Sequence, residues 1–130
     1  MLARTSYPKP YVNAVRARVG RVLKAYDKAK PAEPFAGDAL ADVILGLEMA
    51  FVHRVRMNEG KDGNALNEVR MIAASILEFD AVMTLDKTIK WKPEASVTGL
   101  KIGDKIALSR KQVGALADAF LDEIEAKYHG

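Results

Sequence analysis

The chain has 130 residues, of which 49% are hydrophobic and 28% charged, and it contains no cysteine. This composition is ordinary for a folded domain and excludes disordered, collagen-like and disulfide-stapled proteins. A chain of this length can bury one hydrophobic core, so we predict a single helical domain over residues 1–130. Its longest apolar stretch, residues 39–52, is interrupted by Asp42 and Glu48 and is shorter than the ~20 residues that cross a bilayer. The first ten residues lack an apolar leader segment, so we expect a cytoplasmic protein without membrane association.

The net charge of +3 is distributed unevenly along the chain. Residues 1–30 carry eight Lys and Arg side chains against one Asp, a net charge of +7, which leaves −4 for residues 31–130. A basic first segment on a mildly acidic body indicates one of two things. It either binds a polyanion such as a nucleic acid, or it is a solvated helix face that keeps the protein soluble.

The first predicted helix begins at Pro8 and Pro10 and continues to Tyr26. Its apolar residues recur at helical spacing: Val12, Val15, Val19, Val22, Leu23 and Tyr26. The other side of the helical wheel carries a basic face: Arg18, Arg21, Lys24 and Lys28. We expect this basic face to point away from the core. Two prolines in residues 30–34 end the helix, which makes that segment a short connector.

A second helix is predicted to follow Asp38 as its N-cap, with a broad apolar stripe from Leu40 to Val55 that is typical of a central helix. The polar run of residues 58–64 contains two glycines and ends this helix. A third helix, with Asn64 as its N-cap, carries a new apolar period: Leu66, Val69, Ala73, Ile76 and Leu77. The second and third helices are therefore predicted to form an antiparallel pair.

The pattern changes after Asp80. Residues 100–108 alternate apolar and other side chains around Gly103 and Asp104, which predicts two short strands joined by a two-residue turn. Ser109 and Gln112 then form a capping-box signature, and a fourth helix continues nearly to the end of the chain. The predicted fold class is mainly α. It is a four-helix bundle-like single domain with a small β-hairpin between the third and fourth helices.

Two arginines interrupt apolar helix faces. Arg54 lies within the stripe of the second helix and Arg70 within that of the third, so antiparallel packing brings them together near the connecting loop. Guanidinium groups suit phosphates and carboxylates because two parallel N–H groups match two oxygens. We therefore predict a candidate anion-binding cluster: His53, Arg54, Asn58, Asn67, Glu68 and Arg70. The structural alternative is that each arginine lays its stem on apolar surface, sends its head to water and pairs with Glu48, Glu68 or Asp80.

The sequence lacks the common motifs of metal, phosphate-loop and hydrolase chemistry. The loop that starts at Asn58 has Gly60 and Val69 where a calcium-binding hand requires ligands. Residues 99–105 have the wrong spacing for a phosphate loop, with Asp104 in place of its lysine. Two histidines without cysteine give no zinc spacing, and no Gly-x-Ser-x-Gly sequence occurs. We therefore predict no metal and no cofactor, and a binding or interaction module in preference to an enzyme.

Apolar residues beyond the main stripes predict self-association as a two-fold homodimer. This surplus consists of Leu45, Met49, Val52 and Trp91. The outer faces of the first and fourth helices carry opposite charge, and we expect them not to pair within one bundle. The prediction is therefore that basic residues of one copy face acidic residues of the other. The residues concerned are Arg18, Arg21 and Lys24 on one side, and Asp118, Asp122 and Glu125 on the other.

Three segments resemble a group of small bacterial, largely actinobacterial, proteins to which no activity is assigned: residues 59–70, 86–90 and 99–106. This resemblance covers roughly the second half of the chain and implies a bacterial cytosolic protein. Residues 67–70, Asn-Glu-Val-Arg, are also similar to an arginine-led stretch of the helical HEPN ribonucleases, whose catalytic pattern has four to six residues between an Arg and a following His. Neither His53 nor His129 follows an arginine at that spacing. A nucleic-acid-associated protein or a HEPN-like ribonuclease is the alternative to a binding module.

Overall fold

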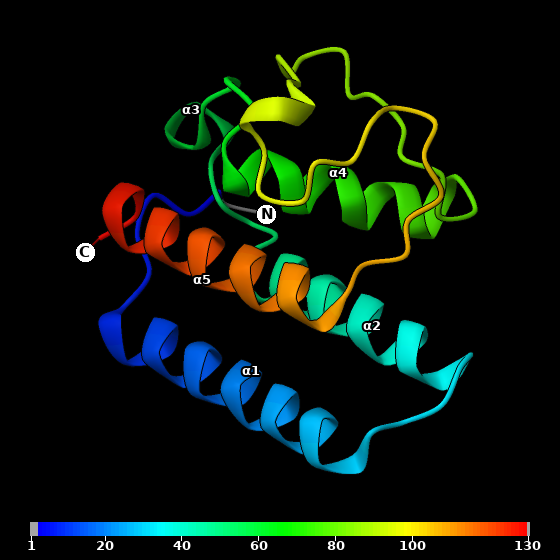
Figure 1. Cartoon of the computed structure of the whole chain (residues 1–130). Coiled ribbons are helices and arrows are strands. Elements are labelled where there is room, and N and C mark those ends of the chain that lie inside the picture. The colour runs from blue at the N-terminus through cyan, green and yellow to red at the C-terminus, as the bar shows by residue number, and fades with distance from the viewer. Residues whose placement is uncertain (1–2, 130) are drawn as a thin grey trace.

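A computed structural model of the chain describes residues 3–129. Its elements are α1 (Lys9–Ala29), α2 (Phe35–Ala50), α3 (Arg56–Glu59), α4 (Ala65–Glu78), a 3-10 turn η1 (Pro93–Ala95) and α5 (Arg110–Lys127). The fold is mainly α with four long helices, as predicted. Helices α2 and α5 contact each other and lie between α1 on one side and α4 on the other (Figure 1). Each helix in this part of the chain is too short or too polar to cross a membrane.

The hydrophobic core lies among α2, α4 and α5. Its largest fully buried side chains are Tyr128, Phe51, Phe120, Ile44, Leu47, Leu66, Met71, Ile72, Met83, Leu116, Leu121 and Ile124. Helix α1 is peripheral, because only Val12 and Leu23 of its 21 residues are buried. Much of the apolar stripe predicted for this helix therefore remains partly open to solvent.

The predicted helix caps at Asn64 and Ser109 are confirmed. The Asn64 side chain accepts a hydrogen bond from the Asn67 amide (3.0 Å) at the start of α4. At the start of α5, Ser109 Oγ accepts from the Gln112 amide (3.1 Å), and Gln112 Oε1 accepts from the Ser109 amide (2.8 Å). Both bonds of the capping box are present, so this helix starts at the predicted residue.

The predicted bounds of the second helix are wrong at both ends. Helix α2 begins at Phe35, before the predicted cap Asp38, and ends at Ala50. The Arg4 amide donates to the His53 carbonyl (2.6 Å), and the Val55 amide donates to the Arg4 carbonyl (2.9 Å). These bonds to the N-terminal segment hold residues 53–55 in a non-helical conformation. Arg54 therefore lies beyond α2, in a turn that leads into the single helical turn α3.

The predicted β-hairpin at residues 100–108 is also wrong, since residues 3–129 contain no strand, only isolated bridges. The backbone of this segment pairs with the stretch after α4: the Met83 amide donates to Asp104 (2.8 Å), and the Ile106 amide donates to Ala81 (2.7 Å). Gly103, with φ of 95°, occupies a tight turn that is closed by the Asp104 amide on the Lys101 carbonyl (3.0 Å). The alternating pattern therefore reflects pairing with a distant segment.

Candidate functional site

A buried polar cluster joins α3 to α4, and the Glu59 carboxylate lies at its centre. This side chain is fully buried. One carboxylate oxygen accepts from Arg54 Nε (2.9 Å) and Arg70 Nη2 (2.6 Å), and the other accepts from Arg70 Nε (3.1 Å) and Asn67 Nδ2 (2.7 Å). One donor from Arg54, in the turn before α3, and three from α4 saturate the carboxylate, and Arg70 donates to both of its oxygens.

The remaining N–H groups of Arg54 are also used. Its guanidinium donates to Glu48 Oε1 (2.9 Å) and to the carbonyls of Phe51 (3.1 Å) and Leu66 (3.2 Å). The two arginines and the two glutamates of this cluster balance in charge. Glu48 is one of the partners predicted for Arg54 in the structural alternative, but the head of Arg54 is buried and does not reach water as that alternative expects.

Electrostatics keeps Glu59 and Arg70 ionised. Burial acts to raise the pKa of Glu59, but hydrogen bonds and charge from Arg70 and Arg54 outweigh it and lower that pKa below its usual value. Burial acts to lower the pKa of Arg70, and its bond to Glu59 reverses the effect and raises that pKa. Removing one partner of such a buried group leaves an uncompensated charge, which costs about 3–5 kcal/mol.

The structure brings together three of the six residues predicted for the anion-binding cluster: Arg54, Asn67 and Arg70. His53 and Asn58 are exposed and lie outside the network. Glu68 is buried but binds a different segment. It accepts from the amides of Val97 (2.9 Å) and Thr98 (2.8 Å) and from the Thr98 hydroxyl (2.6 Å). Glu68 therefore tethers the loop before α5 to α4. The carboxylate that binds both arginines is that of Glu59.

Sequence reasoning missed Glu59, which lies within the polar run of residues 58–64 that is predicted to end the second helix. The available signal was indirect. Two arginines on apolar helix faces need more than one carboxylate nearby, and Glu59 is the acidic residue next to the turn that joins them. Asp80, another predicted partner, lies instead beside Lys105 (4.0 Å) on the surface.

The basic face of α1 is exposed at all four of its predicted residues: Arg18, Arg21, Lys24 and Lys28. The expectation that the charges of the first and last helices do not pair within one molecule is wrong. Because α1 packs directly on α5, Arg16 binds Asp122 (3.2 Å) and Glu125 (2.8 Å), and Arg110 binds Asp27 (2.9 Å). Asp122 and Glu125 are therefore already engaged within the chain.

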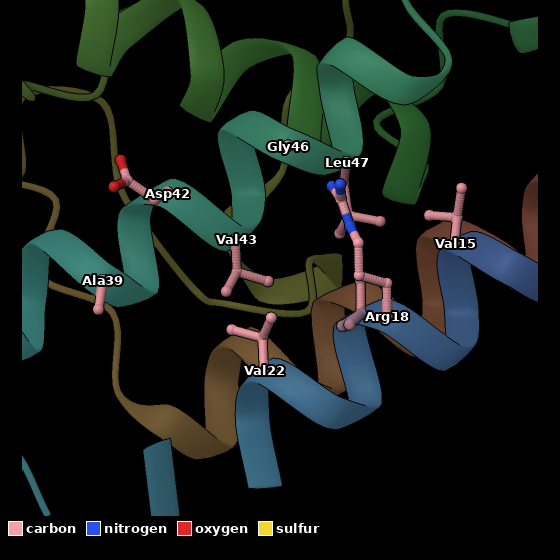
Figure 2. A pocket seen from close by; sticks show the side chains of 9 residues that line it. Val15, Arg18, Val22, Ala39, Asp42, Val43, Gly46 and Leu47 are labelled. Carbon is pink, nitrogen blue, oxygen red and sulfur yellow. The ribbon is translucent and has the colours of Figure 1, made fainter. Parts of the chain in front are cut away.

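A continuous apolar groove runs between α1 and α2, and we call it the α1/α2 groove. Its central hollow has a volume of about 280 Å³ (Figure 2). The walls of this hollow are Val15, Arg18, Val19, Val22, Ala39, Asp42, Val43, Gly46 and Leu47. The groove extends past Tyr11, Ala14, Met49 and Ala50 at one end. It extends past Ala25, Tyr26, Ala29, Pro31 and Phe35 at the other. The groove thus follows nearly the whole length of both helices.

Large apolar side chains are exposed along this groove. Their exposed fractions are 73% for Met49, 67% for Phe35, 46% for Val22 and 42% for Tyr11. Arg18 extends from α1 over the gap toward Gly46, whereas Asp42 points away from α1 on the far flank of α2 (Figure 2). One flank of the groove is therefore basic and the other acidic.

Comparisons of the chain with protein families, with curated protein sequences and with solved structures find no match. The two sites described above, the buried arginine cluster and the α1/α2 groove, are the features from which function is inferred.

Proposed function

We propose that the protein is a non-catalytic interaction module that acts as a two-fold homodimer, with the two copies joined through the α1/α2 groove. The observation that carries this proposal is the groove itself: a continuous apolar channel with four large apolar side chains exposed along it. Contiguous apolar surface of this kind marks an interaction site on a protein surface.

The charge around the groove favours a second copy as the occupant. A two-fold contact places the same patch on both sides, so that patch has to be complementary to itself. A groove with a basic flank and an acidic flank meets this requirement. The small residues Ala39, Gly46 and Ala50 also allow helices of another molecule to approach the groove floor. Apolar burial supplies most of the binding free energy, and the exposed charges select the partner.

The arginine cluster supports an anion-binding function less well than the groove supports association. The guanidinium groups of Arg54 and Arg70 already bind the buried carboxylate of Glu59. An external anion would have to displace that carboxylate, which would leave it buried without partners. This comparison favours a structural role for the cluster.

The test of the dimer is a charge placed on the groove floor. A side chain at Gly46 points into the groove, where a Cβ atom would meet only the Arg18 guanidinium at 3.5 Å. Gly46→Glu therefore leaves the fold intact but puts a carboxylate on the apolar groove floor of each copy, where association would have to bury it. Gly20→Glu is the matched control, because a Cβ atom there has nothing within 4 Å and faces α5.

Sedimentation equilibrium should give twice the 14.2 kDa chain mass for the wild type and for Gly20→Glu, and the single chain mass for Gly46→Glu. A wild-type chain that stays at 14.2 kDa up to millimolar concentration contradicts the proposal. A dimer that persists in Gly46→Glu shows that another surface joins the copies.

Polyanion binding by the basic face is a second candidate, favoured by the exposure of all four of its side chains. Lys24 and Lys28 lie away from the groove and remain accessible in the proposed dimer. If this face binds phosphates, Lys24→Gln with Lys28→Gln should lower the salt concentration at which the protein leaves a heparin column. Equal, early elution of both proteins removes this candidate.

A further inference from the structure

Two rows of exposed charge flank the α1/α2 groove. The basic row consists of Arg18, which lines the groove, and the exposed Arg21 three residues further along α1. The acidic row consists of Asp42, which lines the groove, and the exposed Asp38 one turn earlier in α2. None of these four side chains forms an ion pair or a side-chain hydrogen bond with any other residue of the described range 3–129. Their charges are therefore available to a partner molecule.

Helices α1 and α2 run in opposite directions along the groove. At one end the Tyr11 hydroxyl donates to the Ala50 carbonyl (2.5 Å), and at the other Tyr26 lines the groove together with Phe35. Two copies can cover each other's groove around a two-fold axis that runs either along the groove or across it. The two axes give different helix neighbours.

An axis along the groove places α1 of each copy opposite α2 of its partner. The basic row then faces the acidic row twice, once for each half of the two-fold contact. An axis across the groove places α1 opposite the partner's α1 and α2 opposite the partner's α2. Basic then faces basic and acidic faces acidic, and like charges in contact oppose association.

We infer that the axis runs along the groove, so that Arg18 and Arg21 of each copy face Asp38 and Asp42 of the other. This inference rests on the dimer proposed above and adds its geometry and its specificity determinants. The Arg18 side chain that lies over the groove is exposed, and it turns from its own groove to the acidic row of the partner. The contact thereby selects a second copy of this chain over proteins that carry only an apolar helix face.

Charge reversal of each row tests the assignment. One variant carries Arg18→Glu with Arg21→Glu, a second carries Asp38→Lys with Asp42→Lys, and a third carries all four changes. With the axis along the groove, each single-row reversal should raise the dissociation constant at least tenfold, and the four-fold variant should recover the wild-type value within a few-fold. Far-UV circular dichroism checks that all four proteins remain folded.

Cross-linking of introduced cysteines tests the geometry directly. The chain has no cysteine of its own, so only the introduced residues can react. Ala14 and Ala25 are exposed, line opposite ends of the groove and are about 16 Å apart along α1. With the axis along the groove, each residue of α1 lies at the same position along the groove as the same residue of the partner. A short bis-maleimide should then join Ala14→Cys to itself and Ala25→Cys to itself.

An axis across the groove brings Ala14 level with the partner's Ala25, so only a mixture of the two cysteine variants would cross-link. Cross-linking only in the mixture would overturn this inference, and so would a single-row reversal that leaves the dissociation constant unchanged or lowers it. In both cases the homodimer stands. A wild-type chain that is monomeric at all concentrations overturns the homodimer as well, so the two failures are distinguishable.

Discussion

At the scale of single residues, the buried Glu59 carboxylate sets the contact between α3 and α4, because Arg54, Asn67 and Arg70 all donate to it. The geometry of Arg70 matters as much as its charge. A guanidinium fork binds both carboxylate oxygens, whereas a lysine ammonium is a single point charge. The bidentate bond is therefore a large part of what keeps Glu59 ionised in the interior.

The pH dependence of stability should report this bond. The pKa of folded Glu59 lies below its usual 4.5, so its stabilisation is fully present above pH 4.5 and is lost as the pH falls through the folded value. Arg70→Lys should raise that folded pKa and move the loss of stability to higher pH. Urea unfolding between pH 7 and pH 3 measures this, with Arg21→Lys on the exposed face as the control. Identical pH profiles for Arg70→Lys and the wild type would refute it.

The sequence predicted that interior arginines need acidic partners, and Glu48 is one of them. The role of Glu59 was not predicted, because helical periodicity cannot identify a four-residue helix within a polar loop. The assignment of Glu68 to the arginines failed for a related reason. Its position on α4 was predicted, but the loop that it binds lies 29 residues away in sequence and has no periodic pattern.

At the scale of elements, local signals predicted the starts of α4 and α5 but not that of α2, which begins before the predicted cap Asp38. The caps at Asn64 and Ser109 depend on bonds within three residues, and both were found from sequence. The end of α2 and the fold of residues 100–108 depend on bonds to Arg4 and to residues 81–83. Such distant pairings override a local pattern, because the same alternation satisfies a hairpin or a pairing with any other extended segment.

The loop between η1 and α5 should depend on the tether at Glu68. Glu68→Ala removes the acceptor of the Val97 and Thr98 amides, at a cost of about 1–3 kcal/mol. We expect faster hydrogen exchange at those two amides, while amides in the centre of α5 keep their protection. Glu94→Ala is the matched control, since Glu94 is exposed in η1, directly before this loop. Unchanged exchange at residues 97 and 98 would show that the remaining loop contacts suffice without Glu68.

At the scale of the whole molecule, the position of α1 determines what surface is left for a partner. This helix packs on α2 and α5 through few buried residues, which leaves the groove open on one side. Of the predicted apolar surplus, Met49 is exposed on the groove, whereas Leu45 and Trp91 are partly buried. The exposed basic face was predicted, but the sequence assigned the opposing charge to the last helix. The acidic row on α2 lies beside the basic row only because α1 packs next to α2. Helical periodicity does not predict which helices pack together.

Self-association through the groove should couple stability to protein concentration. A partner that binds only the folded chain stabilises it by mass action, by about 2.7 kcal/mol when its concentration is ~100-fold above the dissociation constant. The wild-type Tm should therefore rise by several degrees between low and high micromolar concentration, and so should that of Gly20→Glu. The Tm of Gly46→Glu should not change with concentration, because its folded state is the monomer. At low concentration, where every protein is monomeric, Gly46→Glu should be at least as stable as the wild type, since glutamate replaces a glycine inside a helix. A concentration-independent wild-type Tm would mean that association, if any, does not stabilise the fold.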